Sequence, residues 1–127
     1  MKARNCGPCG LYCGACAAAD CDGCRSDRVD DWVRQCPFRK CAAEKHLTFC
    51  CHCGDYPCIS LSGFMTDKWP HHWTMRPNLD HVQKRGVEDW LRAQKRTWSC
   101  DACGAGTYWY QRKCSCGKPL AAWELPA

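Results

Sequence analysis

The chain has 127 residues and a formal charge of +5, and its 16 cysteines supply much of an apolar content of 46%. Because Leu, Ile, Val and Phe are scarce, the sequence excludes an ordinary globular domain built around a large aliphatic core. No apolar signal segment and no membrane-spanning stretch is visible, so we expect a cytoplasmic protein whose reduced cysteines bind metal rather than form disulfides.

The formal charge counts every thiol as neutral, whereas metal binding requires thiolates. If all cysteines filled four four-thiolate zinc sites, each site would carry about −2 and the total would change from +5 to about −3. A basic composition therefore does not by itself indicate a nucleic-acid-binding protein. Positive charge remains over residues 84–118, which carry eight Lys or Arg against three acidic residues.

The first predicted module is a cysteine-rich, mainly helical segment over residues 1–60. Ser26 favours a helix over residues 27–35, and Pro37, which suits a first helical turn, favours another over residues 37–46. The module contains enough cysteines for three four-sulfur sites, but their spacing does not fix the pairing. These predicted metal ligands are Cys6, Cys9, Cys13, Cys16, Cys21, Cys24, Cys36, Cys41, Cys50, Cys51, Cys53 and Cys58.

The histidines are weaker candidates than the cysteines. His46 and His52 lie within the cysteine array and are spare ligands, although a histidine at such a position is more often a surface residue. His71, His72 and His81 lie outside the array, and we expect them to be solvated.

Residues 61–97 form a predicted connector of loop and helix. Residues 61–77 show little periodicity and are predicted to be an ordered loop. Asn78 is a favourable N-cap for a helix that Gly86 ends, and a further helix is predicted to continue to about Arg96.

The strongest motif lies in the last predicted module, a zinc ribbon over residues 98–127. Two close cysteine pairs joined by a β-hairpin place four sulfurs around one Zn²⁺, and Gly104 and Gly117 permit the left-handed turns that follow each pair. Tyr108 to Tyr110 suit a strand of that hairpin. The predicted ligands are Cys100, Cys103, Cys114 and Cys116. The sequence thus predicts a small α+β fold that metal stabilises, with about four Zn²⁺ per chain.

The same segment offers a possible partner face. Trp109, Tyr110, Arg112 and Lys113 combine aromatic and cationic side chains, as surfaces that bind single-stranded nucleic acid do. The plainer interpretation is a closed structural zinc site without such a face.

Cys9, Cys13 and Cys16 follow a spacing known from radical S-adenosylmethionine enzymes. Those enzymes need a much longer (β/α) barrel, so we reject that interpretation. The spacing still allows a [4Fe–4S] cluster, because thiolates bind iron–sulfur clusters as well as zinc.

The ordered motifs of this chain resemble those of the family called domain of unknown function 3795. The resemblance extends over nearly the whole chain and rests on residues 9–16, 21–26, 36–42, 49–58 and 78–91 together with the cysteine pairs after Trp98. It implies a bacterial or archaeal cytoplasmic protein, often from an anaerobe, and implies no particular reaction. Cys6 and Cys51 are additional to the pattern of that family.

Taken together, the sequence favours a non-catalytic zinc protein that binds an unknown protein or nucleic-acid partner. No nucleophile–base pair or carboxylate pair stands out, and no membrane contact or small-molecule substrate is indicated. The alternative is an iron–sulfur redox protein that uses the N-terminal cysteines, and a third hypothesis is a thiol enzyme or metal-handling protein using Cys6 or Cys51.

Overall fold

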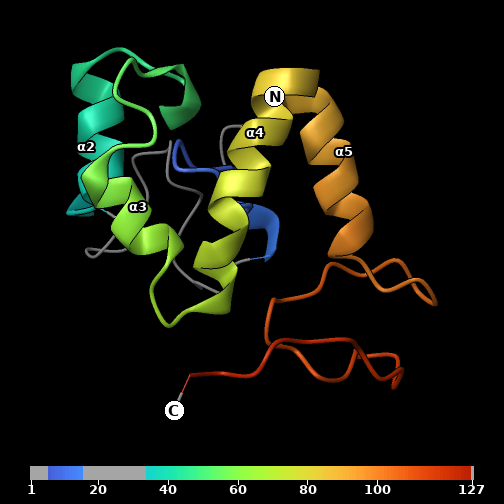
Figure 1. The fold of residues 1–127 in the computed structure, drawn as a ribbon. Helices are drawn as coiled ribbons and strands as arrows, with labels where there is room; N and C mark the ends of the chain where they lie inside the picture. Colours follow the sequence, from blue (N-terminus) through green and yellow to red (C-terminus); the bar gives the residue numbers. More distant parts are fainter. Residues whose placement is uncertain (1–5, 16–33, 127) are drawn as a thin grey trace.

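The structure is a computed structural model and describes residues 6–15 and 34–126. Within these ranges the protein consists of short helices followed by a C-terminal segment of turns (Figure 1). The elements are η2 (Cys13–Ala15), α2 (Pro37–Glu44), η3 (Cys50–His52), α3 (Ile59–Met65), η4 (Pro70–Thr74), α4 (Met75–Arg85) and α5 (Val87–Thr97). No helix in the described ranges has the length and apolarity needed to cross a bilayer.

The helices α4 and α5 form an antiparallel pair (Figure 1). Gly86 separates them: its φ of 87° is in the left-handed region, and its N–H donates to the Val82 carbonyl at 2.9 Å. Only glycine adopts such a conformation without strain. The predicted helix end at Gly86 and the predicted second helix are confirmed. The helix predicted from Pro37 is also confirmed, as α2.

Two predictions for the connector are wrong. Residues 61–77 are not a loop, because they contain most of α3 and all of η4. Asn78 is not an N-cap, because α4 already begins at Met75. The amide of Asn78 is buried and donates to the Gly10 carbonyl at 2.8 Å, so a tertiary contact uses the side chain that the sequence assigned to capping.

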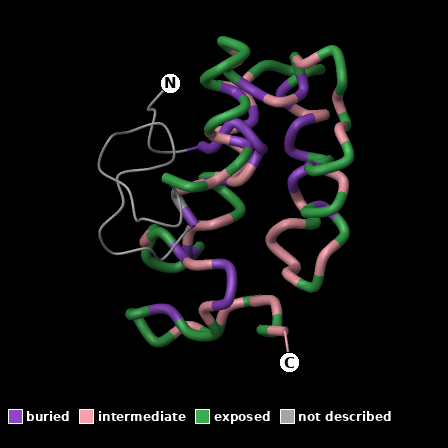
Figure 2. Tube along the Cα trace, turned by 90° about the vertical axis from the view of Figure 1, so that its left-hand side faces the viewer, coloured by how far each residue is buried: buried purple, intermediate pink, exposed green. Residues whose placement is uncertain are grey.

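The core is a single cluster of aromatic, aliphatic and cysteine side chains. Trp90 of α5 is fully buried and meets the rings of Tyr12 and Phe49 edge-on, with centroids 6.3 and 6.2 Å away. Segment 6–15 passes behind α4 in the view of Figure 1, and its Pro8 carbonyl accepts the Cys50 N–H at 2.8 Å. Buried and exposed stretches alternate along the helices, as expected for elements with one side toward a core (Figure 2). Buried thiols contribute to this core as small apolar groups.

The predicted hairpin strands after Thr97 are wrong. Within residues 98–126 the structure has turns and two isolated antiparallel bridges, Ser99 with Gly106 and Lys113 with Pro119. The described part of the protein is therefore mostly helical rather than α+β. The helix predicted over residues 27–35 falls almost entirely outside the described residues, and the module boundaries 1–60, 61–97 and 98–127 stay predictions.

Gly10 provides a test of how segment 6–15 packs on α4. Its φ is 92°, and an added Cβ would meet Leu79 Cγ at 2.8 Å and the Met75 carbonyl oxygen at 3.0 Å. We expect Gly10→Ala to lower the free energy of unfolding by about 2 kcal/mol or more, measured by denaturant titration. The control is Gly63→Ala in α3, where nothing lies within 4 Å. That change should raise stability by up to about 1 kcal/mol. If the two changes altered the free energy of unfolding equally, the close packing of Gly10 on α4 would be contradicted.

Candidate metal centre

Four cysteine sulfurs meet in the C-terminal segment. The Sγ atoms of Cys100, Cys103, Cys114 and Cys116 all lie within 4.8 Å of one another. Cys100 and Cys116 are separated by 3.8 Å between sulfurs, and Cys103 and Cys114 by 3.5 Å. Thiolates bound at about 2.3 Å to a tetrahedral Zn²⁺ would be about 3.8 Å apart. The spacing of this quartet therefore fits a single tetrahedral ion, and the structure brings together the four ligands that the sequence grouped.

Two similar turns hold the cysteines of the quartet. In the first turn, the Gly104 N–H donates to the Cys100 carbonyl at 2.8 Å; in the second, the Gly117 N–H donates to the Cys114 carbonyl at 2.9 Å. Both glycines have positive φ, 79° and 95°, as the sequence predicted. Each turn thus directs two sulfurs to one side without a regular sheet.

The electrostatics of the quartet favour a bound cation. A hydrogen bond from the Cys116 backbone N–H and contacts with the other sulfurs lower the pKa of Cys114 to about 6. The Ala105 N–H acts to lower the pKa of Cys103, but the neighbouring sulfurs, Cys114 first, outweigh it and raise that pKa to about 11. A bound metal ion would supply the positive charge that favours the thiolate form of all four cysteines.

A salt bridge joins the two turns outside the sulfurs. Lys118 donates to the carboxylate of Asp101, and this contact lowers the pKa of Asp101 and raises that of Lys118. Both side chains are substantially exposed, so the pair positions the turns rather than adding much stability.

A second group of cysteines lines a cavity of about 100 Å³ between α2, η3 and α3. Burial, together with the nearby thiolates of Cys58, Cys41 and Cys53, raises the pKa of the Cys50 thiol to about 12. Apart from Lys45, the other lining residues are largely apolar. The lining comprises Phe38, Cys41, Ala42, Lys45, Leu47, Cys50, Cys53, Tyr56, Cys58 and Leu61.

The remaining N-terminal cysteines have other positions. Cys6, Cys9 and Cys51 are buried in the core cluster, and Cys13 and Cys36 are half-buried. Three further predicted ligands, Cys16, Cys21 and Cys24, lie outside the described residues. The described part of the chain thus brings four of the twelve N-terminal candidates to one cavity.

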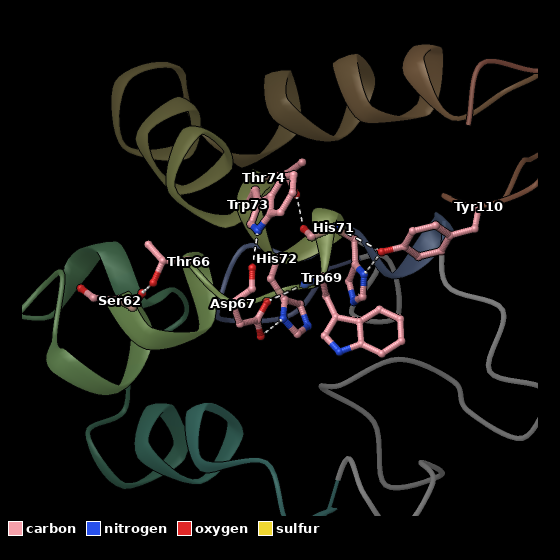
Figure 3. Close-up of polar contacts among 9 residues, drawn as sticks. All are labelled: Ser62, Thr66, Asp67, Trp69, His71, His72, Trp73, Thr74 and Tyr110. Carbon is pink, nitrogen blue, oxygen red and sulfur yellow. Dashed lines mark hydrogen bonds and ion pairs between the residues drawn. The ribbon is translucent and has the colours of Figure 1, made fainter. Parts of the chain in front are cut away.

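The histidines outside the array are not solvated as predicted. His71, His72 and His81 are half-buried. His72 Nδ1 lies 2.6 Å from a carboxylate oxygen of Asp67, and His81 Nε2 lies 2.7 Å from one of Asp89 (the His72 contact is seen in Figure 3). His46 and His52, by contrast, are exposed. The prediction that these three histidines are solvated failed because each ring has a hydrogen-bonding partner that the sequence does not reveal.

His71 connects η4 to the C-terminal segment. Its Nδ1 lies 2.7 Å from the Tyr110 hydroxyl, which also accepts the His71 backbone N–H at 3.4 Å (Figure 3). Its ring stacks on Trp109 with centroids 4.5 Å apart. Burial and the charge of His72 lower the pKa of His71 to about 4, so the ring is neutral, and its tautomer sets which partner donates in the hydrogen bond between Nδ1 and the Tyr110 hydroxyl. The sequence missed this residue; its only signal is the density of Trp and His after Lys68.

The packing of Trp109 and Tyr110 shows that the predicted partner face is only partly exposed. Trp109 and Tyr110 are buried, with exposed fractions of 6% and 8%. Their rings pack on His71 and Trp69 and are not open for bases to stack on. Arg112 and Lys113 are exposed and are the members of the predicted face that a partner can reach.

Comparisons with known proteins find a family that is similar to part of the chain, and they indicate no activity. The family described as "Protein of unknown function (DUF3795)" matches residues 17–63, which confirms the resemblance over that part of the chain. The matched part includes the cavity cysteines and ends well before the quartet. No curated protein and no solved structure matches the chain significantly.

The buried neutral His71 predicts a stability change with pH. Its pKa of about 4 lies below its ordinary value of 6.5, so the unfolded chain binds this proton more readily. The contribution of His71 to stability is therefore fully present above pH 6.5 and is lost as the pH drops toward 4. The measurement is the free energy of unfolding against pH for the wild type and His71→Phe. Any zinc release in acid affects both proteins, so the smaller slope expected for the variant isolates His71; parallel slopes would contradict the assignment.

Proposed function

We propose that the chain is a non-catalytic zinc protein in which the quartet binds one structural Zn²⁺. The observation that carries this proposal is the convergence of four cysteine sulfurs within 4.8 Å. A donor set of thiolates alone suits zinc or iron–sulfur chemistry and does not suit magnesium or calcium. Because all four positions of a tetrahedral ion are taken by protein ligands, none is left for a substrate or a water.

The paired turns support a zinc-ribbon type of site. Each turn supplies two sulfurs, and one isolated bridge pairs the residues that flank it: Ser99 with Gly106, and Lys113 with Pro119. Residues 98–126 contain no helix, and Cys100 and Cys114 are the only buried members of the quartet. The fold of this segment therefore depends on the metal, which supplies folding free energy directly in structural zinc sites.

The exposed cations of the same segment support a negatively charged partner, either nucleic acid or an acidic protein. Arg112 and Lys113 lie on the surface immediately before Cys114. Exposed cations also line the last turns of α5, at Lys95 and Arg96. With the aromatic rings packed inside, contacts to phosphates rather than base stacking would provide the affinity.

Removing one exposed ligand tests the zinc site. We expect Cys116→Ser to lose one equivalent of zinc per chain, measured by elemental analysis after dialysis. Residues 98–126 should then lose protection from hydrogen exchange, while α4 and α5 keep theirs because an apolar core holds them.

The matched control for that variant is Ser115→Ala, which changes the exposed residue between two ligands. It should retain its zinc and its exchange protection. If Cys116→Ser kept a full equivalent of zinc, the quartet would not be the site.

The charged partner face gives a separate prediction. We expect the zinc-loaded protein to bind single-stranded DNA in fluorescence anisotropy, with an affinity that falls as salt rises. The double variant Arg112→Ala and Lys113→Ala should reduce the slope of log affinity against log salt by about 1.4. The control Lys40→Ala, an exposed lysine on α2, should leave it unchanged. An equal slope in the double variant and the wild type would remove Arg112 and Lys113 from the interface.

A further inference from the structure

The cavity between α2, η3 and α3 is formed by cysteines from three separate elements. Cys41 comes from α2, Cys50 begins η3, and Cys58 is the N-cap of α3; Cys53 follows η3. All four lie in the lining of the same cavity. Apolar packing alone does not account for four thiols from different elements around one cavity. The other lining residues, such as Phe38, Leu47 and Leu61, already supply its apolar surface.

The geometry of this cavity differs from that of the quartet. Among the residues that the structure describes, only the quartet gathers its sulfurs within 4.8 Å. The cavity sulfurs are therefore farther apart than four ligands of a single zinc ion should be. The cavity itself, about 100 Å³, is several times the share of one water molecule, roughly 30 Å³. The site is thus wide for one ion and suits a bound group of several atoms.

Hydrogen bonds to the cavity sulfurs also support a bound group. The backbone N–H of Asp55 donates to Cys53 Sγ at 3.4 Å, and that of Leu61 donates to Cys58 Sγ at 3.4 Å. Lys45 Nζ donates to Cys53 Sγ at 3.3 Å, placing a cation at the edge of the cavity. Hydrogen bonds to sulfur and an apolar surrounding are the features by which proteins stabilise and tune iron–sulfur clusters.

We infer that this cavity binds an iron–sulfur cluster of the [4Fe–4S] type through the thiolates of Cys41, Cys50, Cys53 and Cys58. A cubane of iron and sulfide is itself several ångströms across, so its four ligands stand farther apart than those of one ion. This assignment differs from the cluster on Cys9, Cys13 and Cys16 that the sequence spacing allowed. Cys9 lies in the core cluster, and Cys16 lies outside the described residues.

The test compares two adjacent cysteines in the full chain. The protein is purified without oxygen and incubated with ferrous and ferric iron in equal amounts and with sulfide, which supply the irons of a [4Fe–4S]²⁺ cluster, and its iron, acid-labile sulfide, zinc and visible spectrum are measured. The wild type should bind about four iron and four sulfide per chain and absorb in the visible range. Cys50→Ala should lose most of this iron and sulfide while keeping the zinc of the quartet. The control Cys51→Ala alters a cysteine that does not line the cavity, and it should keep both metals.

A second measurement covers the case in which Cys50→Ala does not fold. In the wild type, alkylation followed by peptide mass spectrometry should show the four cavity cysteines becoming protected when the cluster is loaded. Iron retained by a folded Cys50→Ala, or unprotected cavity thiols in a loaded wild type, would overturn the assignment. A second zinc equivalent at these cysteines in place of iron and sulfide would overturn it equally. Because zinc in the quartet is measured separately, these outcomes are independent of the proposed zinc site.

Discussion

The sulfurs of the quartet lie within 4.8 Å of one another, and as four thiolates they would repel unless a cation bound among them. The C-terminal segment depends on this constraint. Residues 98–126 contain no helix and two isolated bridges, so turns and scattered backbone hydrogen bonds define the segment. A metal bound at the quartet, as we propose, would join those turns. The stacking of Trp109 on His71 then attaches the segment to η4 and hence to the helices.

The cysteines of the helical part serve other purposes. Cys6 and Cys51 are buried with Trp90 and Phe49, where a thiol fills space as a small apolar group. This explains how a chain with few aliphatic residues still forms one core: aromatic rings and sulfur replace the missing Leu, Ile and Val. The cavity cysteines lie at the edge of that core, where the cluster that we propose would have an apolar surrounding and the cationic Lys45 nearby. The family match includes this part of the chain and ends before the quartet.

The sequence predicted the structure correctly where a single residue determines the local backbone conformation. Pro37 begins α2 because its ring fixes a helical φ, and Gly86 separates α4 from α5 because it adopts a left-handed φ. The quartet was predictable because its spacing is set by tetrahedral geometry. The predictions failed where contacts between distant segments determine the position of a side chain. The Asn78 amide bonds Gly10 across the fold, and Trp109 packs inward on His71; neither contact leaves a periodic pattern in the sequence. The short helix α3 was not predicted because it contains a glycine and two serines, which are poor helix formers.

The most direct test of the central claim is X-ray absorption at the zinc edge of the protein purified without oxygen, because it reports only the surroundings of zinc. The account predicts a first shell of sulfur alone, with about four ligands at about 2.3 Å. A shell containing nitrogen or oxygen, or a protein that contains no zinc at all, would contradict the assignment of the quartet as a closed structural site.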